Sequence, residues 1–331
     1  MTLCCREYES WILKNLLGEH FIIVHGPRWS GKSYFVQKVL ESTDWNYIII
    51  DAHEAWKEKK SWLERKIVSD IVESAKQDKP LGAVKDIRGV SLSTNNIKNF
   101  DDVLESIDDD VYFVFDHAEF LRFARGVDFR ESFQDKIDER GNIHFIFVPR
   151  GTGELIKWLG PRDPDSPLFM RYERYIDIDY FSPHDSVNFL ENEFERTSIE
   201  HDLNELFEAY RFIGGSPVWL KRYSELRVEN SPEKALKLLA REVCEKVQSE
   251  LGKMGRSVNI HLRVLQTIAR KTPYDGYTDL KTVYKTFGKK RNEVDKYLKN
   301  LIDRGYLKII FHNAYAIALP IVHRCLSTNI E

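Results

Sequence analysis

A glycine-rich segment near the N-terminus carries the strongest chemical signal in the sequence. Residues 26–33 read Gly-Pro-Arg-Trp-Ser-Gly-Lys-Ser, which fits the pattern GxxxxGK[ST] of the P-loop. Such a loop binds phosphate because its glycines let backbone N–H groups curve around the oxygens, and the helix that follows adds partial positive charge. The motif assigns Lys32 to the β- and γ-phosphates of a nucleotide and the Ser33 hydroxyl to Mg²⁺. The expected nucleotide-binding residues are Gly26, Pro27, Arg28, Trp29, Ser30, Gly31, Lys32, Ser33 and Tyr34.

An aspartate at the end of an apolar run supplies the second carboxylate position that a P-loop requires. Asp116 follows the run Val111–Phe115, in the pattern of a Walker B motif, and such an aspartate holds Mg²⁺. We therefore expect Ser33 and Asp116 to be the metal ligands. The next position often carries a glutamate that polarises the attacking water, but here it is His117. The nearest carboxylate is Glu119, which is either part of the site or an ordinary surface residue.

Short apolar runs that alternate with helix-like segments must position these residues. Because such runs are typical of buried parallel strands, they predict a sheet covered by helices on both faces. Ligands of such sheets bind beyond the C-terminal ends of the strands, where the P-loop and Asp116 lie. One helix is expected from Lys32 to Glu41. A long amphipathic helix is expected from Trp56 to Ala75, with Trp62, Leu63, Ile67, Ile71 and Val72 on its apolar side. The expected strands are Phe21–His25, Tyr47–Ile50, Val111–Phe115, Ile143–Val148 and the weaker Tyr175–Tyr180.

The C-terminal half has a different character. Ser182-Pro183 and Ser231-Pro232 are helix start signals, and they predict an all-helical domain. Three further helices are expected at 261–270, 279–287 and 289–304, followed by a hairpin around His312-Asn313, which is the winged-helix pattern. The expected domains are 1–181, 182–253 and 254–331.

Six short motifs occur in an order that resembles a known family. They are Cys5–Glu9, the P-loop, the Walker B run, Val148–Arg150, Ser166–Arg171 and Gly214–Pro217. In this order the chain resembles the archaeal ATPases of the STAND class, relatives of the AAA+ ATPases, over nearly its whole length. The resemblance implies an α/β fold with an AAA+-like P-loop parallel sheet, then an all-helical lid and a C-terminal winged helix. It also implies hydrolysis of ATP to ADP and phosphate with Mg²⁺ as cofactor.

The resemblance assigns roles to further residues. Arg6 and Glu7 match a motif near the adenine, and Arg150 stands at the sensor position that meets the γ-phosphate. Arg171 matches the arginine of an SPLxxR-like segment, a residue that also suggests self-association, and Pro217 matches a lid proline that packs on the nucleotide. An alternative interpretation is that Arg150 and Arg171 are ordinary surface cations. Likewise, Gly214–Pro217 has the alternative interpretation of a linker between two helices. The catalytic candidates are Lys32, Asp116, His117, Glu119, Arg150 and Arg171.

One departure from the family bears on the rate of hydrolysis. The family usually has glutamate directly after the Walker B aspartate, and His117 stands there instead. The departure leaves nucleotide binding intact and favours slow hydrolysis. The leading hypothesis is a nucleotide-controlled ATPase switch in which ATP bridges the core and the lid. The alternative is a nucleic-acid-binding regulator, or a protein like the origin initiators, in which ATP is structural and barely hydrolysed.

The expected winged helix is the most basic part of the chain. Residues 279–310 contain nine Lys and Arg and four Asp and Glu, so their net charge is +5 while the whole chain carries −3. Cations at the start of a helix interact unfavourably with the helix dipole, so their presence there suggests a binding role. Contact with a phosphate backbone is one such role. Binding to double-stranded DNA or docking to a protein partner are both open, and the acidic Asp295 and Asp303 argue against DNA. The candidate DNA-binding residues are Lys289, Lys290, Arg291, Lys296 and Lys299.

Composition excludes several classes of protein. The near balance of 49 Lys and Arg with 52 Asp and Glu excludes nucleic-acid binding through bulk charge alone. Hydrophobic residues make up 42%, too many for a disordered chain, and the longest apolar runs are of strand length. Four cysteines without a CxxC pair give no sign of a zinc site or a disulfide scaffold. We expect a soluble, cytoplasmic protein that does not bind membranes.

Overall fold

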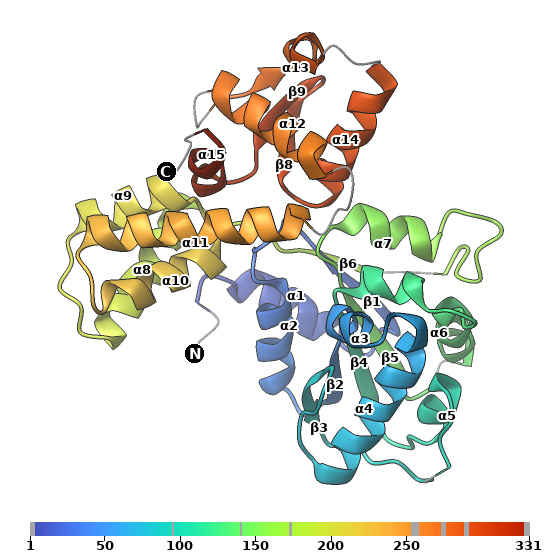
Figure 1. The fold of residues 1–331 in the computed structure, drawn as a ribbon. Coiled ribbons are helices and arrows are strands. Elements are labelled where there is room, and N and C mark those ends of the chain that lie inside the picture. The colour runs from blue at the N-terminus through green and yellow to red at the C-terminus, as the bar shows by residue number, and fades with distance from the viewer. Residues whose placement is uncertain are drawn as a thin grey trace. The chain divides into compact units, whose positions relative to one another are not determined.

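The computed structural model describes residues 4–94, 96–139, 141–171, 174–252, 258–272, 276–287 and 291–327 (Figure 1). The chain divides into two compact units. The first consists of Met1–Gly26 and Lys32–Ile178, and the second of Pro27–Gly31 and Asp179–Glu331. The tip of the P-loop, residues 27–31, therefore belongs with the C-terminal half of the chain. The division at 181 and 253 into three domains stays a prediction.

A six-stranded sheet forms the centre of the first unit. Its strand order is β3-β2-β4-β5-β1-β6. All neighbours pair in parallel except β3, which runs antiparallel to β2 at the edge. The strands are β1 (Phe21–His25), β2 (Asn46–Asp51), β3 (Val84–Arg88), β4 (Val111–Asp116), β5 (Ile143–Val148) and β6 (Arg174–Asp177). The expected parallel sheet is confirmed.

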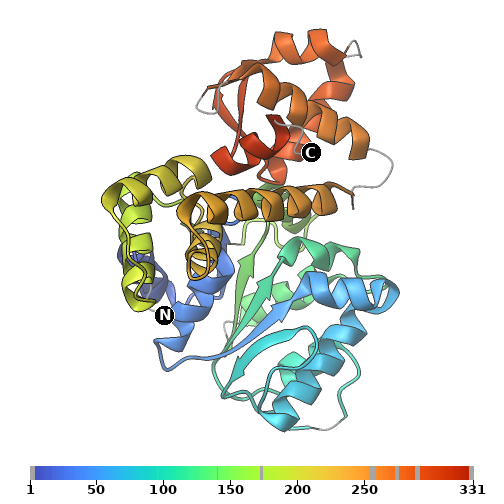
Figure 2. The same ribbon diagram turned by 60° about the vertical axis from the view of Figure 1, so that its left-hand side comes forward.

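Helices cover both faces of this sheet because the side chains of each strand alternate between two apolar cores. Along β4, Phe113 and Phe115 join one core, and Tyr112 and Val114 join the other. The first core contains residues of α4 (Leu63–Gln77), α5 (Phe100–Glu105), α6 (Phe129–Glu139) and α7 (Thr152–Leu159). The second contains residues of α1 (Glu7–Leu16) and α2 (Lys32–Glu41). Figures 1 and 2 show α2 and α4 on opposite sides of the sheet.

The expected helix from Trp56 to Ala75 is wrong as one continuous element. The chain instead forms α3 (Ala52–Glu58), a 3-10 turn η1 (Lys60–Trp62) and then α4. Asp51 starts α3 by accepting hydrogen bonds from the N–H groups of His53 and Glu54. Because of this break, the residues before α4 do not continue the buried side of that helix. Trp62, which was expected on the buried side, is 53% exposed.

Strand β3 escapes sequence-based prediction for a physical reason. It reads Val-Lys-Asp-Ile-Arg, with three charged residues among five, and lacks the apolar run of the central strands. Charged side chains are tolerated there because an edge strand pairs on one side and faces solvent on the other. A 3-10 helix, η2 (Ala118–Phe123), follows β4 and was not expected either.

The second unit begins with four helices that agree with the expected all-helical segment. They are α8 (Pro183–Arg196), α9 (Leu203–Ile213), α10 (Pro217–Arg227) and α11 (Pro232–Gly252). Ser182 caps α8 by accepting a hydrogen bond from the Asp185 N–H at 3.1 Å, as its Ser-Pro start signal predicts. Gly214 to Ser216 connect α9 to α10, and Pro217 is the first residue of α10.

The chain then forms helices and a small antiparallel sheet. The elements are α12 (Val258–Lys271), β7 (Thr278–Asp279), α13 (Leu280–Phe287), α14 (Arg291–Asp303), β8 (Leu307–Phe311), β9 (Ala314–Ile317) and α15 (Pro320–Ser327). The sheet has the order β7-β9-β8, and β8 and β9 are the expected hairpin. A disulfide between Cys244 of α11 and Cys325 of α15 joins distant parts of this unit. No helix in the described part of the chain is long and apolar enough to cross a membrane.

Candidate nucleotide-binding site

The P-loop connects β1 to α2, as its motif requires. Gly26 has a φ of +138°, and a Cβ atom there would lie 2.1 Å from the backbone oxygen of Ile178, so only glycine fits. Gly31 has a φ of +84°, which also favours glycine. The Lys32 side chain is buried and donates a hydrogen bond from Nζ to the Gly26 carbonyl oxygen at 2.9 Å. Lys32 is therefore directed along the loop that the motif assigns to phosphate.

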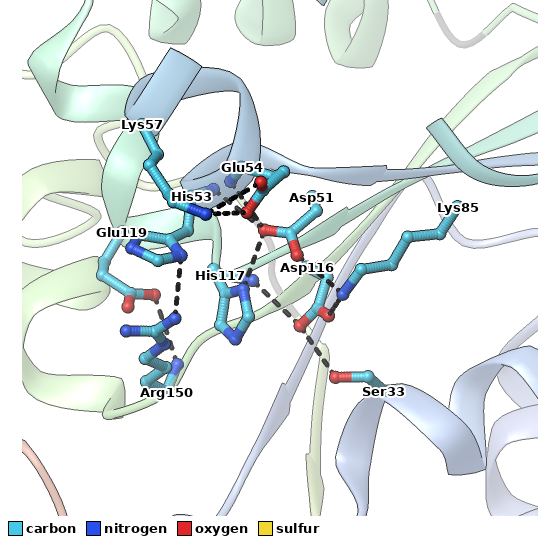
Figure 3. A network of polar contacts seen from close by, with 10 residues as sticks. All are labelled: Ser33, Asp51, His53, Glu54, Lys57, Lys85, Asp116, His117, Glu119 and Arg150. Atoms are coloured by element: carbon cyan, nitrogen blue, oxygen red, sulfur yellow. Dashed lines mark hydrogen bonds and ion pairs between the residues drawn. The ribbon is translucent and has the colours of Figure 1, made fainter. Parts of the chain in front are cut away.

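The two expected metal ligands meet at the end of β4. Ser33 Oγ donates a hydrogen bond to Asp116 Oδ1 at 2.7 Å (Figure 3). Asp116 is buried, and burial raises the pKa of its carboxyl, but the nearby His117 and the Lys85 ammonium outweigh that effect. The pKa of Asp116 consequently lies below its ordinary value, and the side chain is a carboxylate.

A second aspartate, which sequence reasoning did not assign to the site, lies beside Asp116. Asp51 ends β2 in register with Asp116 at the end of β4. Its Oδ1 atom lies 2.9 Å from His117 Nδ1, and its Oδ2 atom lies 2.8 Å from Lys85 Nζ. These contacts outweigh the opposing effect of burial and hold the pKa of Asp51 below its ordinary value. The available signal was its position, because Asp51 and Asp116 both directly follow an apolar run.

Glu119 and Arg150 lie together near the same strand ends. Glu119 is 5% exposed, so its interpretation as a surface residue is wrong. Its Oε2 atom accepts a hydrogen bond from the Arg150 N–H at 3.2 Å, and burial raises the pKa of its carboxyl. An Arg150 side-chain nitrogen lies 3.0 Å from His53 Nδ1, and the guanidinium lies over the Phe120 ring. Figure 3 shows this group next to Asp51 and His117.

The remaining residues of the first unit that the resemblance singled out have local partners. Arg6 precedes α1 and forms an ion pair with Glu9 at 2.7 Å. Glu7 accepts a hydrogen bond from the Cys5 N–H at 3.2 Å. Their placement near an adenine stays a prediction.

Arg171 forms an ion pair with Asp138 of α6 at 2.5 Å, and both side chains are partly exposed. This pairing is compatible with a surface cation. The site role of Arg171 and self-association through it stay predictions.

The tip of the P-loop is held within the second unit. The Arg28 side chain is 8% exposed, forms an ion pair with Glu250 of α11, and lies 5.3 Å from the centre of the Tyr306 ring. Ser216 Oγ donates a hydrogen bond to the Trp29 carbonyl oxygen at 2.8 Å.

Pro217, the expected lid proline, lies beside the loop as well. Its Cγ atom would lie 3.2 Å from a Cβ atom added to Gly31. Pro217 is thus placed next to the loop that the motif assigns to phosphate, and its packing on a nucleotide stays a prediction.

Solved structures show which fold carries this site. The Walker-type ATPase PABY2304 of Pyrococcus abyssi is similar over 98% of this chain and 96% of its own, with a TM-score of 0.84 and 21% sequence identity. The Aeropyrum pernix ORC1 protein, solved in complex with DNA, is similar over 98% and 93% of the two chains, with a TM-score of 0.50 and 14% identity. The Thermotoga maritima RuvB Holliday junction branch migration motor is similar over 95% and 92%, with a TM-score of 0.51 and 12% identity.

The chain has the fold of the AAA+ P-loop ATPases. No protein-family model matches the sequence, and no curated protein sequence matches it either. The AAA+ fold explains why the P-loop and Asp116 come together, because β1 and β4 both end at the same edge of a parallel sheet.

Within this AAA+ fold, the donor atoms at the end of β4 suit Mg²⁺. Ser33 offers a hydroxyl oxygen and Asp116 a carboxylate, and hard oxygen ligands are those that Mg²⁺ prefers. Among the described residues, Asp51, His53 and His117 also offer ligand atoms that lie within 4.8 Å of one another. The first pair fits the metal that a P-loop nucleotide brings with it.

The candidate DNA-binding residues lie in and before α14. Lys296 and Lys299 of α14 are exposed, and Arg291 is the first residue of that helix. Lys289 and Lys290, expected at the start of the helix, lie outside the described residues.

Proposed function

We propose that this protein binds Mg²⁺·ATP at its P-loop and slowly hydrolyses it to ADP and phosphate, as a nucleotide-controlled switch. The observation that carries the proposal is the 2.7 Å hydrogen bond from Ser33 to Asp116, which unites the metal ligands of the P-loop and of the Walker B strand. The similarity to the Walker-type ATPase of Pyrococcus abyssi supports it.

The residues of the first unit have distinct tasks in this proposal. Lys32 supplies a positive charge to the β- and γ-phosphates, and Ser33 and Asp116 hold Mg²⁺. The bound ion would neutralise the charge that develops on the phosphates during transfer. His117 stands where a glutamate would polarise water, which favours slow turnover. Arg150 is the candidate sensor of the γ-phosphate.

The division of the P-loop between the two compact units supports the hypothesis of a nucleotide-controlled switch. Residues 27–31 group with the second unit, while Lys32 and Ser33 group with the first. A nucleotide on the loop would thus act on both parts of the chain through the backbone itself. The assignment to the archaeal STAND class rests on the ordered sequence motifs alone.

We also propose that the C-terminal segment, expected as residues 254–331, forms a winged helix that contacts double-stranded DNA. The element order and the exposed Lys296 and Lys299 favour this role, and the ORC1 protein with a similar fold was solved with DNA. Docking to a protein is the competing outcome, and the affinity for a labelled DNA duplex at several salt concentrations separates the two.

The variant Lys32→Ala tests the nucleotide site. Removal of a charged donor costs about 1.5–3 kcal/mol. ATP affinity should therefore fall by about 10- to 100-fold, since each 1.4 kcal/mol is a factor of about ten. Isothermal titration calorimetry with Mg²⁺·ATP measures this affinity. Lys38→Ala on the same helix removes an equal charge from an ion pair with Glu41 and should leave the affinity unchanged. A folded Lys32→Ala protein with wild-type affinity would refute the P-loop assignment.

A further inference from the structure

The ammonium group of Lys85 lies between the two aspartates at the strand ends. Lys85 Nζ lies 2.5 Å from Asp116 Oδ2 and 2.8 Å from Asp51 Oδ2, and Figure 3 shows it reaching both. It comes from β3, the antiparallel edge strand that no motif of the sequence pointed to. The cation therefore reaches the Walker B aspartate from outside the set of parallel strands.

The surroundings of this ammonium show which partner is fixed and which is able to move. The Asp116 and Asp51 side chains are 4% and 11% exposed, whereas the Lys85 side chain is 43% exposed. Asp116 Oδ1 is engaged by Ser33 and by the His117 N–H. Asp116 Oδ2 accepts a hydrogen bond from Lys85 Nζ at 2.5 Å. The lysine is long and half-exposed, so it is able to leave without disturbing the core.

Lys85 balances the charge of the two carboxylates. Two carboxylates at neighbouring strand ends repel each other, and a cation that touches both removes that repulsion. Mg²⁺ requires oxygen ligands and strict geometry, and it competes with an ammonium for the same carboxylate oxygen. Lys85 and a metal ion held by Asp116 are thus alternative counterions.

We propose that Lys85 is a built-in counterion that occupies the cation position beside Asp116 and is exchanged for Mg²⁺ when the nucleotide binds. This inference rests on the proposed function, because it assumes that Asp116 holds the metal of a bound nucleotide. Lys85 acts through Asp116 and is a positioning residue. It stabilises the nucleotide-free site and keeps free divalent cations out of it.

The test measures binding of Mn²⁺ alone, without nucleotide, by electron paramagnetic resonance. Lys85→Met should bind Mn²⁺ about tenfold more tightly than the wild type. A factor of this size lies within the usual range of coupling energies between two groups that compete for one site. Lys85→Arg keeps the charge, so its Mn²⁺ binding should stay as weak as that of the wild type. Lys79→Met is a control at an exposed lysine in the segment between α4 and β3. Lys85→Met combined with Asp116→Asn should lose the gain. Equal Mn²⁺ affinity in wild type and Lys85→Met would overturn the proposal.

A second measurement uses the unaltered protein and does not depend on a variant that folds. An amine-acetylating reagent followed by mass spectrometry should label Lys85 slowly in the nucleotide-free protein and faster with Mg²⁺·ADP, while Lys79 labelling stays constant. Unchanged or slower labelling of Lys85, in a sample shown by calorimetry to bind Mg²⁺·ADP, would contradict the exchange. If calorimetry detects no nucleotide binding at all, the proposed function itself fails, so the two failures are distinct.

Discussion

His117 Nδ1 lies 2.9 Å from Asp51 Oδ1, so the histidine that follows the Walker B aspartate has a carboxylate partner of its own. This contact fixes the orientation of the imidazole ring, and His117 itself has a left-handed φ of 55°. Asp51 in turn is held by the N–H groups that begin α3. The pair therefore gives the site a rigid polar group at the position directly after Asp116.

The first prediction concerns the rate that this histidine permits. His117→Glu should raise the steady-state ATPase rate at least about tenfold, because a positioned general base typically contributes 10²–10⁴-fold. Combining it with Asp51→Asn should raise the rate further, since the new carboxylate then has no charged neighbour at residue 51. A coupled phosphate-release assay measures both. A wild-type rate already within about 1–100 s⁻¹, the range of kinases, would contradict slow turnover.

The second prediction concerns the metal. Asp116→Asn removes a negative ligand, so it should weaken nucleotide binding in Mg²⁺ and abolish hydrolysis. Binding in EDTA should change much less, because the carboxylate acts through the metal. Calorimetry with ATP in Mg²⁺ and in EDTA gives both values for one preparation. Equal loss under the two conditions would mean that Asp116 supports the fold of the loop and not the metal.

The third prediction concerns acid stability. The pKa of Asp51 is lower in the folded protein than the unfolded value of 3.8, so its network stabilises the fold above that pH. The contribution is lost as the pH falls below 3.8 toward the folded pKa. The difference in unfolding free energy between wild type and Asp51→Asn should therefore shrink below about pH 4. Urea unfolding at several pH values measures it, and a constant difference down to pH 2 would exclude the linkage.

The fourth prediction concerns the tip of the P-loop. Arg28 and Glu250 form an ion pair whose side chains are 8% and 11% exposed, and Tyr306 donates a hydrogen bond to Glu250 at 2.8 Å. Removing one partner of a buried pair costs about 3–5 kcal/mol, so Glu250→Gln should lower the unfolding free energy by an amount of this order.

A control for this variant lies on the same helix. Glu242→Gln breaks the half-exposed pair with Arg222 and should cost less than about 1 kcal/mol. Urea denaturation compares the two variants. Equal small effects would show that Glu250 does not hold Arg28 in solution.

The sequence allowed parts of this site to be predicted and not others. The P-loop and Asp116 are recognisable because their chemistry depends on local spacing and on an apolar strand that precedes each. Lys85 was out of reach, since its strand is charged and its partners Asp51 and Asp116 are brought to it by tertiary pairing. The helix from Trp56 was misjudged because periodicity does not reveal the break at Lys59, where a cap interrupts the apolar pattern.

The last prediction concerns the C-terminal basic residues. Lys289, Lys290 and Arg291 cluster in sequence, and if they contact phosphates each lost contact should reduce the salt slope of log affinity by about 0.9. Replacing all three with alanine should weaken binding to any duplex and flatten the slope by up to about three units. Sequence preference should change little because phosphates carry no base information. ATP affinity should stay the same, since Lys32, Ser33 and Asp116 are untouched.

A variant of equal charge tests whether position matters in this experiment. Lys234, Lys237 and Arg241 all lie on α11, so their replacement removes three positive charges away from α14. That protein should keep the wild-type salt slope, because the slope counts the cations that contact phosphates and the proposal places those contacts at α14. Fluorescence anisotropy with a labelled duplex at four salt concentrations compares the three proteins. If the wild type has no duplex affinity at low salt, with or without ATP, the C-terminal segment 254–331 does not bind DNA. The exposed cations of α14 would then contact a protein. The same two variants would show whether the salt dependence of that protein contact comes from α14 or from α11.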